Sequence, residues 1–209
     1  WKGMMTQKHI GYTSWNDDFS VDKQPEVFRL SEENVGGYIF EGTGGYVAME
    51  AEHFFETKSP ESLKWQVIPD MGRTLGGITL MPYTKSVEGT TVSYKMVLPE
   101  EIKKCKTVNV IVKSTLAFHN TDGHRYAIGF RNGNKVTVNY NHDLNEHPEN
   151  IYTTFYPTVA RRVVEKQVRL DLPVSQDGSY IIDFSPLDPA VVLEKIVVDY
   201  GGYKKSYLY

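Results

Sequence analysis

Two carboxylates that follow the Gly44-Gly45 turn, Glu50 and Glu52, are the residues whose type and spacing best suit chemistry. They lie within residues 46–54, which follow Gly44-Gly45 and alternate apolar and polar side chains. A strand has a side-chain period of two, so both carboxylates lie on one face and three apolar side chains lie on the other. Carboxylates on one face repel each other unless a cation, a proton or hydrogen-bond donors lie between them.

Calcium is one cation that would satisfy this pair, because it takes about six to eight oxygen ligands from carboxylates and carbonyls. Glu50 and Glu52 would supply two ligands, and Asp199 a third if the last strand pairs beside them. The alternative is a pair of partly exposed carboxylates neutralised by a basic side chain: Lys195, Lys58 or Arg73. The residues leave both open, so calcium is a candidate structural ion and no cofactor is required.

A catalytic role for the same two glutamates is a weaker prediction. Glycoside hydrolysis needs two carboxyl groups on opposite sides of the sugar, roughly 5–5.5 Å apart for retention or 6.5–9.5 Å for inversion. Neighbouring same-face positions on a strand are about 7 Å apart, but Glu50 and Glu52 stand in parallel. No phosphate loop, nucleophile elbow or Ser/His/Asp order is present either. We assign no catalytic residue.

Residues suited to sugar binding lie in several loops and strands. Aromatic faces stack on pyranose rings, while polar side chains at the rim make directed hydrogen bonds. The carbohydrate-binding candidates are therefore Trp65, Tyr83, His119, Asn120, Arg125 and Tyr140. Core packing is the alternative for the aromatic rings, since each buries a large area. Arg125 suits a uronate carboxylate, which it can bind bidentately, or the nearby Asp122.

Composition excludes several other classes of site. The single cysteine, Cys105, excludes an internal disulfide and a cysteine-based zinc site. The histidines are scattered over loops without metal-site spacing. A net charge of −3 gives no reason to expect nucleic acid or an anionic membrane as partner. No apolar run approaches the roughly 20 residues of a membrane helix.

Short strand patterns separated by turn signals predict the fold. Alternation is clearest at residues 92–98, and Asn132-Gly133 is a strong hairpin signal. About ten such strands, with turns roughly every eight to twelve residues, are typical of a sandwich. Fourfold apolar spacing predicts a helical insertion near residues 149–165, which Pro157 interrupts. We expect an all-β, two-sheet β-sandwich, of jelly-roll or galactose-binding-like type, with a short helical insertion.

Three stretches carry a resemblance to a known family: residues 9–15, residues 46–53 followed by 68–74, and residues 187–202. Together they resemble the C-terminal region of family 115 glycoside hydrolases, the xylan α-1,2-glucuronidases. This implies a β-sandwich at residues 25–209, at the C-terminal end of a multi-domain enzyme. Residues 1–24 would be the junction with a preceding helical domain, and the catalytic carboxylates would lie upstream of Trp1.

A second, shorter resemblance is to family 6 carbohydrate-binding modules. Those modules also begin with a strand like Met49-Glu50-Ala51-Glu52 and end with a hydrophobic strand carrying an aspartate, as Asp199 does here. In that family the acidic residues hold a structural calcium. The resemblance therefore implies the same candidate ligands as the residue types do.

The first resemblance implies a non-catalytic accessory domain of an α-glucuronidase acting on glucuronoxylan. Its partners would be the upstream catalytic domains, the polysaccharide and, in the parent enzyme, a second copy. A periplasmic or extracellular location is implied too. The alternative is an independent carbohydrate-binding module for xylan or uronate-bearing oligosaccharides, which requires an exposed aromatic platform. A third, weaker hypothesis is a standalone enzyme with Glu50 and Glu52 as acid and base.

Overall fold

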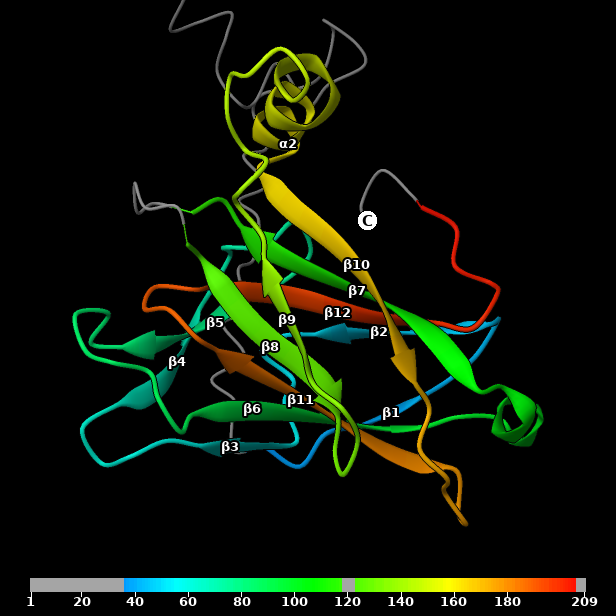
Figure 1. Ribbon diagram of the computed structural model, residues 1–209. Helices are drawn as coiled ribbons and strands as arrows, with labels where there is room; N and C mark the ends of the chain where they lie inside the picture. Colours follow the sequence, from blue (N-terminus) through cyan, green and yellow to red (C-terminus); the bar gives the residue numbers. More distant parts are fainter. Residues whose placement is uncertain (1–35, 118–122, 206–209) are drawn as a thin grey trace, which may run out of the picture. The chain divides into compact units, whose positions relative to one another are not determined.

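The computed structural model describes residues 36–117 and 123–205, which belong to the unit Asn34–Tyr209. These residues form two β-sheets and one prominent helical segment (Figure 1). The predicted all-β, two-sheet sandwich with a short helical insertion is confirmed. The predicted junction segment 1–24, and the boundary at residue 25, lie outside the described residues.

The first sheet, sheet A, has the strand order β1-β6-β11-β8-β9, with β3 added beside β6. Its pairs are antiparallel except that of β1 with β6. The strands are β1 (Ile39–Glu41), β3 (Glu56–Lys58), β6 (Thr91–Val97), β8 (Arg125–Phe130), β9 (Val136–Asn139) and β11 (Ser179–Pro186).

The second sheet, sheet B, has the order β10-β7-β12-β5-β4, and β2 pairs with β12. The strands are β2 (Tyr46–Glu50), β4 (Lys64–Ile68), β5 (Gly77–Met81), β7 (Thr107–Thr115), β10 (Val163–Asp171) and β12 (Leu193–Asp199). β12 is central, with β7 on one edge and both β5 and β2 on the other. All its residues except Asp199 are buried.

Alternating side chains form the core between the sheets, as the sequence predicts. In β6, Val92, Tyr94 and Met96 are fully buried in the main apolar cluster, which also contains Ile196 and Val198 of β12. Burying each large apolar side chain stabilises the fold by about 1.5–3 kcal/mol. The other face of β6 is therefore free to carry polar residues.

The helical insertion is present but shorter than predicted. A π-helical turn, η2 (Ile151–Phe155), leads into α2 (Tyr156–Arg161), with Pro157 in its first turn. The helix ends at Arg161; the next residue, Arg162, has a left-handed φ of 61°, and Val163 already begins β10. Figure 1 shows this segment projecting beyond the sheets. No described helix is long and apolar enough to cross a membrane.

Two local features test the turn and strand predictions. Asn132 has a φ of 65° in the β8–β9 turn, as the Asn-Gly signal predicts. β3 was not predicted, because its residues are exposed and polar and resemble a loop. It pairs with β6 through Glu56, which lies opposite Ser93. The other short helix, η1 (Glu100–Lys104), precedes Cys105, whose side chain is exposed.

A row of four charged side chains crosses sheet B from β2 to β10. The strand register places Glu50 opposite Lys195, Lys195 opposite Lys113, and Lys113 opposite Glu165. Lys195 Nζ lies 2.7 Å from Glu50 Oε1, and Lys113 Nζ lies 3.5 Å from Glu165 Oε2. The two lysines are buried, at 6% and 0% exposed. We call these four residues the charge row.

The residues after β12 close over one end of the charge row. Lys113 Nζ donates a 2.8 Å hydrogen bond to Tyr203 Oη, and Lys205 Nζ lies 2.8 Å from Glu165 Oε1. Burial lowers the pKa of Lys113 to about 8, against the opposing effect of the Glu165 carboxylate. The positive charge of Lys195 contributes to this lowering. Lys113 is therefore costly to keep charged in the folded chain.

Replacing Lys113 with methionine is expected to reveal this cost as a pH dependence. Between pH 8 and its ordinary pKa of 10.5 the folded chain holds fewer protons on Lys113 than the unfolded chain. Wild-type stability therefore rises with pH in this window, while Lys113→Met lacks that rise. The stability of the variant relative to wild type should fall by about 2 kcal/mol between pH 7 and about pH 9.5.

Urea unfolding at three pH values measures this difference. Lys106→Met, at an exposed lysine just before β7, is the matched control and should show no such trend. A relative stability of Lys113→Met that stays constant with pH contradicts the prediction.

Candidate functional site

Glu50 and Glu52 fasten a loop rather than face a cleft. The Glu50 carboxylate pairs with Lys195 and accepts the Thr74 hydroxyl at 2.8 and 2.9 Å. Glu52 accepts the backbone N–H of Gly76 at 2.7 Å, and His53 Nε2 lies 3.6 Å from it. The two carboxylates are thus separated by a lysine and by donors from residues 70–76, which connect β4 to β5.

The predicted calcium ligands do not come together as one set. β12 does pair beside β2, but Asp199 lies opposite Tyr46, whereas Glu50 lies opposite Lys195. Four residues of strand separate these positions by about 13 Å. Asp199 instead accepts the backbone N–H groups of residues 201–203, at 2.9–3.1 Å. Within residues 36–117 and 123–205, no cluster of three or more His, Cys, Asp or Glu could hold a metal.

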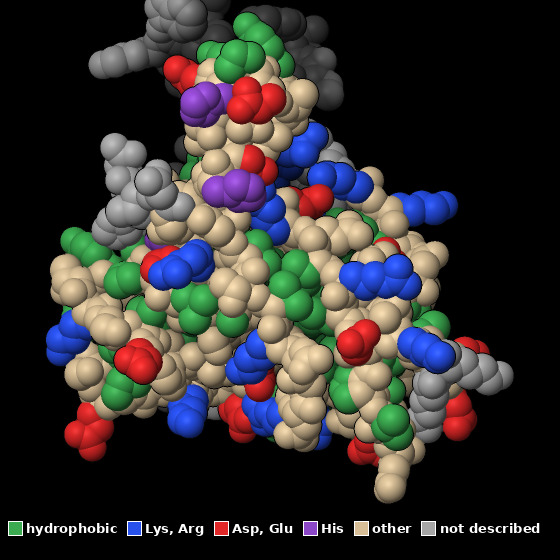
Figure 2. Space-filling model, viewed as in Figure 1, with side chains coloured by type: hydrophobic (Ala, Val, Ile, Leu, Met, Phe, Trp, Pro, Cys, Tyr) green, Lys and Arg blue, Asp and Glu red, His purple; other side chains and the backbone are tan. Residues whose placement is uncertain are grey.

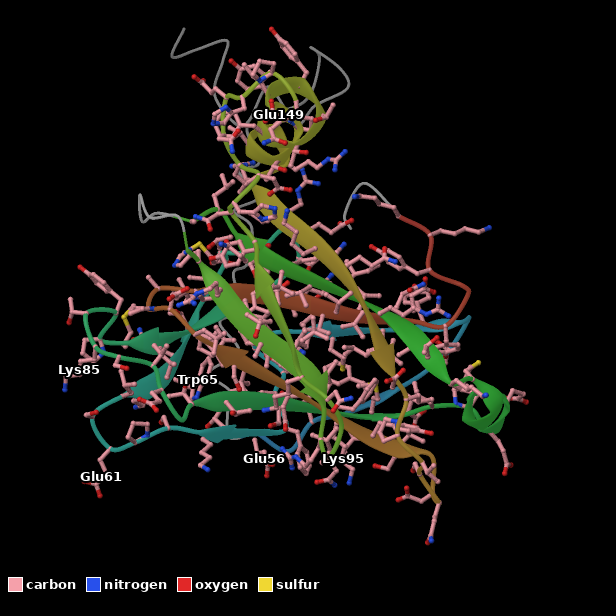
Figure 3. The ribbon with its side chains drawn as sticks, in the orientation of Figure 1. Glu56, Glu61, Trp65, Lys85, Lys95 and Glu149 are labelled. Atoms are coloured by element: carbon pink, nitrogen blue, oxygen red, sulfur yellow. The ribbon has the colours of Figure 1, made fainter. Side chains whose placement is uncertain are left out.

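The aromatic candidates Trp65 and Tyr83 lie apart from the charge row. Trp65 is half-buried on β4, where its ring packs against Leu63, Leu80 and Val87 and its Nε1 donates to the Lys58 carbonyl at 3.1 Å. Tyr83 is 50% exposed in the turn after β5. Figure 3 shows Trp65 beside β4, with the labelled Lys85 and Glu61 farther out at the same end. Only Tyr83 presents a largely free ring.

The remaining carbohydrate candidates are occupied or outside the described residues. Arg125 forms a bidentate pair with Asp188, at 2.9 and 3.0 Å, and this hydrogen bonding lowers the pKa of the Asp188 carboxyl. Tyr140 as a sugar platform is wrong, because its side chain is 1% exposed and its hydroxyl bonds His124 Nδ1 at 2.7 Å. His119 and Asn120 lie outside the described residues.

A polar cavity of about 490 Å³ opens on the outer face of sheet A. At its centre Arg131 joins three strands: its Nη1 lies 2.6 Å from Glu56 Oε1, and its Nη2 lies 2.8 Å from both Asp183 Oδ1 and Ser93 Oγ. Hydrogen bonding to Asp183 raises the pKa of Arg131. The polar residues of β6 and β11 that face away from the core thus form one network.

A second cavity of about 530 Å³ adjoins the first and shares Lys58, Thr91 and Lys135 with it. It adds apolar walls from Val87, Pro186 and Leu187. We call the two cavities the sheet-A trough. Figure 2 shows basic and acidic side chains mixed over the part of the surface where β3, β6 and β11 lie in Figure 1. Such a surface offers both donors and acceptors to a hydroxyl-rich ligand.

A third cavity, of about 420 Å³, lies between the β4–β5 loop and the end of α2. Its exposed lining residues are Asp70, Met71 and Arg73 from the loop, and Arg161 and Arg162 from the helix end. Val163 and Glu194, both buried, form its base. We call it the arginine pocket. Guanidinium groups bind carboxylates and other planar anions bidentately, so this cavity suits an anion.

Sequence reasoning missed the main basic residues that line the sheet-A trough and the arginine pocket. Arg131 follows a strand beside the Asn-Gly turn, and Arg161-Arg162 are adjacent arginines at the end of the helical pattern. The sequence shows Arg131 and the Arg161-Arg162 pair as charged residues at the ends of a predicted strand and a predicted helix. Nothing in the sequence, however, indicated that Arg131 would reach two carboxylates on strands β3 and β11, which lie on either side of β6. Arg73 was considered only as a partner for the glutamates.

Removing Lys195, which forms an ion pair with Glu50, is expected to destabilise the domain. Lys195→Met leaves the Glu50 carboxylate without its ammonium partner, although Thr74 still donates to it. We expect a loss of about 2 kcal/mol in the free energy of unfolding, below the ~3–5 for fully buried pairs, because Glu50 is partly exposed. Lys205→Met, which breaks the exposed pair with Glu165, should cost less than about 1 kcal/mol.

Urea unfolding of both variants tests this ordering. A Lys195→Met cost no larger than that of Lys205→Met would show that Glu50 does not depend on its lysine.

Comparison with solved structures returns matches at low identity, several of them to carbohydrate-active enzymes or carbohydrate-binding modules. A family GH115 4-O-methyl-α-glucuronidase with specificity for decorated arabinogalactans aligns with a TM-score of 0.48 and 12% identity, over 73% of this chain and 18% of that one. The cellotriose-bound module CBM6cm-2 of Cellvibrio mixtus lichenase 5A aligns with a TM-score of 0.41 and 11% identity, over 74% and 96%. The xylan-binding domain CBM22-1 of Paenibacillus barcinonensis Xyn10C gives 0.37 and 11%, over 75% and 94%.

No curated protein matches the sequence. The family comparison is decisive by contrast, because residues 39–209 match the glycosyl hydrolase family 115 C-terminal domain. This range contains both described sheets and all three cavities. The chain therefore belongs to the family of glycosyl hydrolase family 115 C-terminal domains.

Proposed function

We propose that this domain is the non-catalytic accessory domain of a xylan α-1,2-glucuronidase, where it supports the upstream catalytic domains and contacts glucuronoxylan. Membership of the C-terminal domain family supports an accessory or carbohydrate-binding role. The observation that carries the non-catalytic part is the state of the carboxylates. Two of the three carboxylates that line the sheet-A trough, Glu56 and Asp183, are bound to one guanidinium. A polysaccharide substrate would place the parent enzyme in the periplasm or outside the cell.

Carboxylates held in this way cannot take the two different roles that glycoside hydrolysis requires. A glycosidase needs one carboxyl group that carries a proton and another that acts as nucleophile or base. Arg131 donates to Glu56 and Asp183 together, so both serve as hydrogen-bond acceptors in one ion network. Glu50 and Glu52 are occupied by Lys195 and the β4–β5 loop. This argues against the standalone-enzyme hypothesis.

Direct contact with the polysaccharide is favoured by the chemistry of the sheet-A trough. Lys58, Lys135 and the hydroxyl groups of Thr91 and Ser185 line it, and they can donate to or accept from sugar hydroxyls. Its lining contains no aromatic ring. We therefore expect weak, hydrogen-bond-dominated binding. The polar lining also favours an independent carbohydrate-binding module, but the lack of an aromatic platform makes it the second candidate function.

The isolated 209-residue chain is expected to release no glucuronate from glucuronoxylan. The reason is that the carboxylates of Glu50, Glu52, Glu56 and Asp183 are all bound to cations or backbone donors. Chromatography of products after prolonged incubation measures release, with a family 115 enzyme that carries its catalytic domains as the positive control. Sustained release that Glu56→Gln abolishes would overturn the non-catalytic assignment.

Titration of xylan oligosaccharides into the chain is expected to show weak binding that depends on Lys135. Lys135→Ala should reduce affinity about threefold to tenfold, because one charge-assisted hydrogen bond is lost. Lys106→Ala removes the same charge outside the trough and is the matched control. Calcium should leave affinity unchanged, since Lys195 supplies the positive charge at Glu50. Equal effects of the two alanine variants would contradict the trough as the contact surface.

A further inference from the structure

The arginine pocket brings together basic side chains from two separate segments. Arg161 ends α2 and Arg162 follows it, while Arg73 comes from the β4–β5 loop. The side chains of Arg161 and Arg162 are exposed, and within the described part of the chain neither forms an ion pair or side-chain hydrogen bond. Two guanidinium groups at the mouth of the pocket are thus available to an incoming ligand.

Three backbone irregularities meet at this pocket. Asp70 and Arg162 are non-glycine residues in the left-handed region, with φ of 57° and 61°. The pairing of β12 with β7 shifts register between Leu193 and Lys195, a bulge that lies at Glu194. Non-glycine residues with a left-handed backbone change the direction of nearby side chains, and so do β-bulges. Both features are concentrated at functional sites. The pocket's lining residues therefore owe their positions to features that regular strands and helices would not supply.

The wall that carries Arg73 is held in place before any ligand arrives. Thr74 and Gly76, in the same loop, are bonded to Glu50 and Glu52 at 2.7–2.9 Å, and Glu50 is held in turn by Lys195. The Gly72 N–H also donates to the Leu75 carbonyl at 2.9 Å, which closes the turn. A preorganised wall reduces the ordering cost of binding.

Charge in the pocket favours a singly charged ligand that also carries hydroxyl groups. Three arginines face two carboxylates, Asp70 and Glu194, which leaves one net positive charge. A doubly charged phosphate would exceed this charge and lie against a buried carboxylate at the base. A carboxylate on a sugar ring instead matches the guanidinium fork, and its hydroxyls can donate to the acidic oxygens. The volume of about 420 Å³ is in the range of small-molecule sites.

We propose that the arginine pocket binds the carboxylate of a uronate sugar, with Arg161 and Arg162 as the principal donors. The choice of a uronate among carboxylates rests on the proposed function, since a glucuronoxylan carries such substituents. The site is separate from the sheet-A trough, with which it shares no lining residue. An acidic side chain of a neighbouring domain is the competing occupant.

Titration of methyl α-glucuronoside into the full 209-residue chain, followed by NMR, tests the proposal. Methyl α-glucoside, which lacks the carboxylate, and inorganic phosphate are the comparison ligands. The glucuronoside should bind at least tenfold more tightly than either, and its affinity should fall as salt is raised. Arg161→Ala and Arg162→Gly should each weaken it about tenfold, the loss expected for a charge-assisted pair. Glycine suits the left-handed backbone at position 162.

Controls separate a binding effect from a folding effect. Arg169→Ala removes an exposed arginine on β10 outside the pocket and should leave affinity unchanged. Arg161→Lys keeps the charge but loses the fork, so it should recover only part of the affinity. Unchanged melting temperatures of all variants would show that the fold is intact. Equal binding of glucoside and glucuronoside, or of phosphate and glucuronoside, overturns the proposal, as does insensitivity to Arg161→Ala.

The outcome is distinguishable from failure of the proposed function. Glucuronoxylan binding that Lys135→Ala weakens, together with no binding of the glucuronoside, would refute the pocket and leave the accessory function standing. Arginine-dependent binding of the glucuronoside with no affinity for glucuronoxylan would support the pocket and refute the polysaccharide contact. Failure to bind either sugar, with acidic peptides bound through Arg161, would assign the pocket to a protein partner and overturn the uronate proposal.

Discussion

The charge row across sheet B is the interaction on which much of the remaining structure depends. Two buried lysines lie side by side on central strands, and such an arrangement is stable only with acidic partners on both flanks. Glu50 supplies the partner on the β2 side and Glu165 the partner on the β10 side. From Glu50 the network continues to the β4–β5 loop, and from Glu165 to Lys205 in the segment after β12. One row thus fixes two surface segments.

This network explains how two carboxylates on one strand face can have neither a catalytic nor a metal-binding geometry. Their mutual repulsion is relieved by a lysine of the adjacent strand and by donors from a loop that would otherwise be held weakly. Calcium would relieve the same repulsion through oxygen ligands, but the β12 register gives the position beside Glu50 to Lys195 and sends Asp199 about 13 Å away. Glu50 and Glu52 hold the β4–β5 loop in place through hydrogen bonds, and this loop carries Arg73.

Sequence patterns were informative wherever burial dictates residue type. The alternation in β6 reflects which face meets water, so the two-sheet class could be predicted. The Asn-Gly turn was predicted instead from the left-handed backbone that Asn132 adopts, and the helical insertion from its fourfold spacing, although η2 and α2 contain no buried residue. β3 could not, since an exposed edge strand needs no apolar period. The sites were harder still. Arg131, Glu56 and Asp183 are brought together by strand order, and a single sequence gives no strand order. Tyr140 illustrates the converse, because a loop-like composition concealed a buried ring.

Under the proposed function, the sheet-A trough and the arginine pocket would make different physical demands on a polysaccharide, and this gives the accessory domain a rationale. The sheet-A trough offers mixed donors and acceptors without an aromatic platform, so it gains little free energy from any single sugar. The proposed uronate site in the arginine pocket would gain more, but only from sugar residues that bear a carboxylate. When both lie in one polypeptide with catalytic domains, binding at one site makes the next contact intramolecular, and weak affinities multiply through effective concentration. A domain of this kind needs no strong site to hold a decorated chain close to the enzyme, and weak sites also release it after each cut.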